Sequence, residues 1–200
     1  VQTCALPICY FRDIDLLVAH DRVQDACAAL ATCGYQLKPS VLDQRWYSDY
    51  HFHWILQNRA GTIIEVHWAL TLEESTYRTD LERIARNALP LEIGKTRTLM
   101  PQYHDILLHI VLQAISVGYS SQKHIIDAAL LLDRIADWPR LVRSARDYNL
   151  GTGLWFLLRM VADIAGVAAP AEVMSALKPD RLSRAAWQRL RQGELCLDRV

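Results

Sequence analysis

The sequence predicts an α+β fold, in which strands and helices mix over residues 9–100 and an α-helical domain covers residues 101–200. Two short apolar runs, around residues 12–18 and 62–68, alternate in polarity as half-buried strands do. From Pro101 onward, apolar residues instead return every three or four positions, which is typical of one face of an amphipathic helix.

The elements of the first half follow from local signals. Asp21 can cap a helix that runs from about residue 22 to 33, and Gly34 is suited to end it. Residues 58–61 separate two strand patterns and predict a hairpin. The remaining predicted elements are a strand over residues 35–38, the two hairpin strands over 50–57 and 62–68, a polar helix over 79–88 and a short hairpin over 91–99.

Glycine and proline divide the helical half of the chain. Gly151, Gly153 and Pro170 are residue types that commonly stand at helix ends. The predicted helices cover residues 102–117, 123–136, 139–148, 153–166, 170–177 and 179–192.

The composition bounds the classes of function. The chain has 200 residues, is 52 % hydrophobic, and balances 22 basic against 22 acidic side chains, which is typical of a globular protein. The zero net charge gives no broad electrostatic footprint for nucleic acid. No apolar run approaches the roughly 20 residues of a membrane span. The five cysteines include no Cys-x-x-Cys pair, a pattern that indicates a reducing cytoplasm.

Two carboxylates stand two residues apart in the first strand pattern. Strand side chains alternate, so Asp13 and Asp15 project from one face and Ile14 and Leu16 from the other. Adjacent acids repel and raise each other's pKa. A divalent cation between them removes that repulsion, and oxygen ligands suit Mg²⁺. The alternative is a pair of solvated acids where a strand emerges into a loop.

Glu65 is a third acid inside a strand pattern. It lies in the middle of TIIEVHW. Because acids are depleted in strands, its presence there needs an explanation. A third carboxylate on a neighbouring strand completes the ligand set for two metal ions about 3.5–4 Å apart, as used in displacement at phosphorus. We therefore expect the carboxyl oxygens of Asp13, Asp15 and Glu65 to approach within roughly 4–8 Å.

The register of the hairpin decides which histidines lie on the same face as Glu65. A two- or four-residue turn pairs Trp54 with Glu65 and places His51 and His53 on the face opposite His67. A three-residue turn sets His53 beside His67, where a zinc site could form. We favour the first register, in which His67 supports the acidic site or packs with Trp68.

The chain resembles the DNA polymerase β-like nucleotidyltransferase superfamily. The resemblance lies in DIDLLV at residues 13–18, followed by a helix, Gly34-Tyr35 and EVHW at residues 65–68. Within that superfamily the chain most resembles the uncharacterised bacterial nucleotidyltransferase family. The similarity covers most of residues 12–177 and includes HDILLH at 104–109, IIDAALLL at 125–132 and DWPRLVRSA at 137–145.

The resemblance implies a small mixed sheet with flanking helices, two Mg²⁺ ions, and transfer of a nucleoside monophosphate from a nucleoside triphosphate. It implies that Asp13, Asp15 and Glu65 are the catalytic, metal-binding carboxylates. Arg12, directly before the acids, is placed to contact a phosphate, with a solvated or paired arginine as the alternative. His67 is the second residue expected to assist nucleotide binding.

One departure concerns the N-terminus. Members of the superfamily carry a Gly-Ser or Gly-Gly pair roughly 9–13 residues before the first Asp, where backbone amides hold the triphosphate. Here residues 1–8 read VQTCALPI, which matches the translation of a common sequencing-library adapter. We therefore expect residues 1–8 to be an artefact and residues 9–100 to be an N-terminally truncated domain that binds triphosphate weakly or not at all.

Two functions from different classes remain. The first is a nucleotidyltransferase that acts on an unknown hydroxyl acceptor in the full-length protein and is inactive as this truncated chain. The second is a non-catalytic regulatory or antitoxin-like module that keeps the fold and binds a protein partner.

Overall fold

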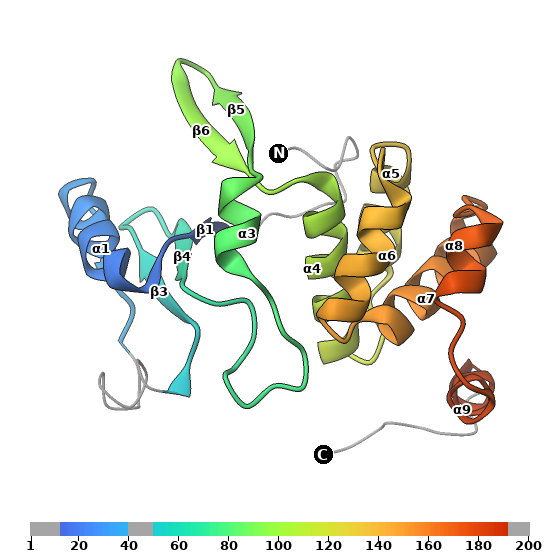
Figure 1. The fold of residues 1–200 in the computed structure, drawn as a ribbon. Coiled ribbons are helices and arrows are strands. Elements are labelled where there is room, and N and C mark those ends of the chain that lie inside the picture. Colours follow the sequence, from blue (N-terminus) through green and yellow to red (C-terminus); the bar gives the residue numbers. More distant parts are fainter. Residues whose placement is uncertain (1–12, 40–49, 192–200) are drawn as a thin grey trace. The chain divides into compact units, whose positions relative to one another are not determined.

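A computed structural model describes residues 13–39 and 50–191 of the chain (Figure 1). The chain divides into two compact units, one up to Glu82 and one from Arg83 onward. No helix in the described ranges is long and apolar enough to cross a membrane.

The first unit contains a four-stranded mixed sheet. Its strands are β1 (Asp13–Leu17), β2 (Gln36–Leu37), β3 (His53–Gln57) and β4 (Ile63–His67), in the order β1-β4-β3-β2. β1 pairs with β4 in parallel, and the β4–β3 and β3–β2 pairs are antiparallel. The α+β fold with a small mixed sheet is therefore confirmed.

Helix α1 (Val23–Thr32) covers one face of this sheet and follows the short 3₁₀ turn η1 (His20–Arg22) (Figure 1). Val23 packs against Leu56, Ile64 and Val66, and all four side chains are buried. Since strand residues alternate, burial of Ile64 and Val66 against α1 turns Glu65 to the other face. Leu56 of β3 and the apolar residues of β4 thus build the core, and Glu65 and His67 are left on the opposite face.

The second unit is mainly helical. It contains α3 (Leu81–Arg86), which begins at the boundary of the two units, and the hairpin β5 (Leu89–Ile93) and β6 (Thr96–Met100). The helices that follow are α4 (Tyr103–Ser116), α5 (Gln122–Leu132), α6 (Trp138–Asp147), α7 (Gly151–Met160) with its π-helical continuation η2 (Val161–Ala165), α8 (Ala171–Ala176) and α9 (Arg181–Arg191). Asp137 caps α6, since its Oδ1 accepts a 2.8 Å hydrogen bond from the backbone N–H of Arg140.

Gly153 allows α4 and α7 to pack closely. A Cβ atom at this position would lie 2.7 Å from Cδ1 of Ile115 and 3.0 Å from Cγ1 of Val111, both on α4. The hydroxyl of Tyr119 donates a 3.1 Å hydrogen bond to the carbonyl oxygen of Gly153. The glycine therefore serves helix packing within α7, whereas the sequence suggested only a helix start.

Candidate functional site: a carboxylate and histidine cluster

The polar face of the sheet brings two of the predicted acids together. The parallel register places Asp15 on β1 opposite Glu65 on β4, and Asp13 opposite Ile63 on the same face. Nε2 of His67 lies 3.3 Å from Oδ1 of Asp15 and 3.2 Å from Oε2 of Glu65. Because both oxygens lie this close to one nitrogen atom, they are no more than about 6.5 Å apart.

The register of the β3–β4 hairpin differs from the favoured prediction. His53 pairs with His67, and Ile55, not Trp54, pairs with Glu65. The predicted placement of His53 on the opposite face is therefore wrong, and the alternative register is the one the chain adopts.

The physical reason lies in the turn. The backbone N–H of Asn58 donates to the carbonyl oxygen of Thr62 at 3.1 Å, and the N–H of Thr62 donates to Oδ1 of Asn58 at 2.9 Å. This pairing leaves a three-residue turn that ends on Gly61, whose φ of 86° favours glycine. An odd number of turn residues moves His53 to the face of Glu65.

His53, Glu65 and His67 form a compact group of possible metal ligands. One ligand atom of each lies within 4.8 Å of the others, and Nε2 of His53 is 3.7 Å from Oε2 of Glu65. The side chains of His53, Glu65 and His67 are 12 %, 21 % and 9 % exposed, whereas that of Asp15 is 53 % exposed. The group is therefore sheltered on the sheet side and open towards Asp15.

Hydrogen bonds and burial shift the pKa values of this group. Burial lowers the pKa of His67, but hydrogen bonds to the carboxylates of Asp15 and Glu65 outweigh it and raise the value to about 9. The hydrogen bond from His67 lowers the pKa of Glu65 in return. Burial lowers the pKa of His53 to about 4, so its imidazole is neutral at physiological pH. The arrangement thus holds one positive charge between two negative ones.

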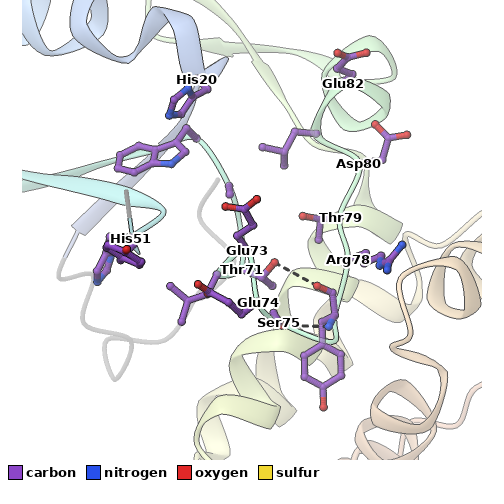
Figure 2. Close-up of a pocket in the computed structure, with 16 residues that line it drawn as sticks. His20, His51, Thr71, Glu73, Glu74, Ser75, Arg78, Thr79, Asp80 and Glu82 are labelled. Atoms are coloured by element: carbon purple, nitrogen blue, oxygen red, sulfur yellow. Dashed lines mark hydrogen bonds between the residues drawn. The ribbon is translucent and has the colours of Figure 1, made fainter. Parts of the chain in front are cut away.

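A cavity of about 980 Å³ adjoins the cluster (Figure 2). His51 lines the cavity, and its ring centroid lies 4.6 Å from that of His53. Figure 2 shows Glu73 on one limb of the loop that follows β4, Asp80 on the other limb, and Glu82 in the first turn of α3. The cavity could hold a substrate next to the cluster.

Hydrogen bonds within the loop shape this cavity. Thr71 Oγ1 donates to the carbonyl oxygen of Tyr77 at 3.4 Å, and the N–H of Tyr77 donates to Oγ of Ser75 at 3.1 Å. No local sequence pattern predicted the cavity, because the path of this loop depends on contacts made after folding.

Of the two residues predicted to bind nucleotide, only one lies among the described residues. His67 is at the centre of the cluster. Arg12 lies outside the described residues, as do residues 1–8. His53 is the site residue that the sequence analysis placed wrongly, and the number of residues in the turn was the signal that would have found it.

The comparison with known families gives one match. A family model described as uncharacterised nucleotidyltransferase matches residues 9–166, which include most of both units. No curated protein matches the chain significantly.

Proposed function

We propose that the site of this chain, which belongs to the uncharacterised nucleotidyltransferase family, is built for two-metal nucleotidyl transfer. The substrates are a nucleoside triphosphate and a molecule with an acceptor hydroxyl. The proposal is supported above all by the parallel pairing of β1 with β4, which sets Asp15 opposite Glu65. Both carboxylates contact the same positively charged side chain, the imidazolium of His67.

The residues of the polar face fit a pair of divalent cations. Asp15 and Glu65 offer oxygen donors that both contact the imidazolium of His67. Asp13 lies two residues before Asp15 on the same face of β1. In this proposal Asp13 and Asp15 hold both Mg²⁺ ions and Glu65 completes one of the two sites. When bound, the ions neutralise the triphosphate and lower the pKa of the acceptor hydroxyl.

The protein's own groups orient and exchange protons. His67 fixes the rotamers of Asp15 and Glu65 through its Nε2, so the carboxylates are aligned before substrate binds. A carboxylate oxygen of Glu65 is also placed to accept the proton of the acceptor hydroxyl. The cavity lined by His51 and Glu73 provides room for the acceptor beside these groups.

The test is transfer of label from α-phosphate-labelled nucleoside triphosphates to small-molecule and protein fractions, with and without Mg²⁺. A parallel version lacks residues 1–8. We expect Asp13→Asn, Asp15→Asn and Glu65→Gln each to reduce transfer on the order of 100-fold or more, because each removes a metal ligand.

Asp25→Asn is the matched control. Asp25 is an exposed acid of the same unit that pairs with Arg22 on the surface at 3.0 Å, so this variant keeps full transfer. If neither version transfers label or binds a triphosphate, while both fold and bind a protein partner, the non-catalytic module is the correct function.

A further inference from the structure

The two imidazole groups beside Glu65 set this site apart from a purely carboxylate one. We infer that His53, His67, Glu65 and Asp15 bind one transition-metal ion of the Zn²⁺ class, while Asp13 and Asp15 keep an oxygen site for Mg²⁺. The inference rests on the proposed function, because it names the kind of cation for one of its two metal positions.

Three of the distances between donor atoms are close to those around a tetrahedral ion, and the donor atoms of His53, Glu65 and His67 all lie within 4.8 Å of one another. Zinc bonds of about 2.0–2.2 Å to nitrogen and oxygen place neighbouring donors of a tetrahedron about 3.3–3.6 Å apart. The donor separations here are 3.2 Å from His67 to Glu65, 3.3 Å from His67 to Asp15 and 3.7 Å from His53 to Glu65. An ion would displace the proton of His67 Nε2 to solvent and could then enter with small side-chain movements.

The chemistry of the donors selects the ion. Imidazole nitrogen suits Zn²⁺ and other late transition metals, whereas Mg²⁺ prefers oxygen ligands and usually keeps several waters. His53 and His67 have side chains that are 12 % and 9 % exposed, so little room remains around them for a hydrated ion. Two sheltered nitrogens next to two carboxylates thus disfavour Mg²⁺ at this position.

The backbone also holds the nitrogen donors in place. His53 and His67 are directly paired residues of neighbouring antiparallel strands, and their rings stack with centroids 4.8 Å apart at 28°. Glu65 lies two residues before His67 on the same face of β4. Three of the four donors therefore come from a single hairpin whose register its three-residue turn fixes.

The experiment follows Co²⁺ by visible absorption and then displaces it with Zn²⁺ in a calorimeter, using the whole chain. We expect the strong absorption of a four- or five-coordinate Co²⁺ site, which hexaaqua-type Co²⁺ lacks. His53→Gln and His67→Gln should each lower Zn²⁺ affinity by more than the roughly 10–100-fold that loss of an outer-shell partner costs. His20→Gln, an exposed histidine of the same unit, should leave affinity unchanged.

Two outcomes would overturn the inference. One is weak, hexaaqua-type Co²⁺ absorption. The other is Zn²⁺ affinity in His53→Gln equal to that of the parent while its thermal unfolding is unaltered.

Asp13→Asn separates the inference from the proposed function. This variant should keep the Co²⁺ spectrum and lose Mg²⁺-dependent nucleotide transfer, whereas His53→Gln should lose the Co²⁺ spectrum. Zn²⁺ binding without any nucleotide binding would support the inference and refute the proposed function. Nucleotide transfer with Mg²⁺ alone and no Zn²⁺ binding would do the reverse.

Discussion

At the scale of single residues, His67 balances the charge of the polar face. Its imidazolium lies between Asp15 and Glu65, so the metal-free protein avoids the repulsion that two neighbouring carboxylates would create. Replacing His67 removes the hydrogen bond that is the main cause of the lowered pKa of Glu65. We expect the pKa of Glu65 to rise in His67→Gln, and carbon-detected NMR titration of the carboxyl group will measure it. An unchanged pKa would show that the hydrogen bond has no such effect.

The same contact makes stability depend on pH. The pKa of His67 is about 9 in the folded chain and 6.5 when unperturbed, so folding favours the protonated imidazole. The stabilisation is fully present below pH 6.5 and is lost as pH rises through about 9. At about 1.4 kcal/mol per pKa unit, it is on the order of 3 kcal/mol.

Denaturant unfolding of metal-free parent and His67→Gln at a series of pH values is the measurement. The difference in free energy of unfolding should shrink across that range as pH rises. A difference that stays constant would contradict the assignment.

At the scale of elements, most boundaries could be predicted from local sequence. The helix predicted over 102–117 is α4 (Tyr103–Ser116), and the helix predicted over 139–148 is α6 (Trp138–Asp147). Both could be predicted because apolar spacing and the Asp137 cap are features of the local sequence. The register of β3 against β4 was missed, since it depends on whether Asn58 and Thr62 pair with each other. The contact of β1 with β4 joins distant segments; the metal-site argument and the family resemblance suggested that these strands are neighbours, but their parallel direction was not predicted.

Helix packing at Gly153 leads to a stability prediction. In Gly153→Ala the new methyl group would meet Ile115, Val111 and Tyr119 at 3.0 Å or less, so these side chains must shift or the two helices must move apart. We expect a loss of about 1–3 kcal/mol, as overpacking typically costs. Gly151→Ala is the matched control on the same helix, because its nearest neighbour would be Leu177 at 3.7 Å.

Thermal and urea unfolding of both variants will measure the difference. Equal stability of Gly153→Ala and Gly151→Ala would show that the α4–α7 contact adapts without cost.

At the scale of the whole molecule, the edge of the sheet affects association. Among the described residues, β1 pairs with β4 alone, and its Ile14 side chain is 51 % exposed. An apolar side chain on an open edge strand is a site for pairing with another chain. We expect the chain to self-associate and Ile14→Lys to reduce that association, as light scattering at several concentrations will show.

Ile93→Lys provides the comparison, since Ile93 is 61 % exposed on β5 in the other unit. If Ile93→Lys reduces association as much as Ile14→Lys, the edge of β1 is not the cause. A monodisperse parent chain would also refute the prediction.

The parallel pairing of β1 with β4 has a consequence for the order of folding. The β3–β4 hairpin closes over a short turn, and contacts so near in sequence form early. β1 reaches β4 only after α1, β2 and β3 have intervened along the chain, and such long-range closure is slow because it loses more chain entropy. His53, Glu65 and His67 are thus assembled by a fast local event, whereas Asp13 and Asp15 join them late.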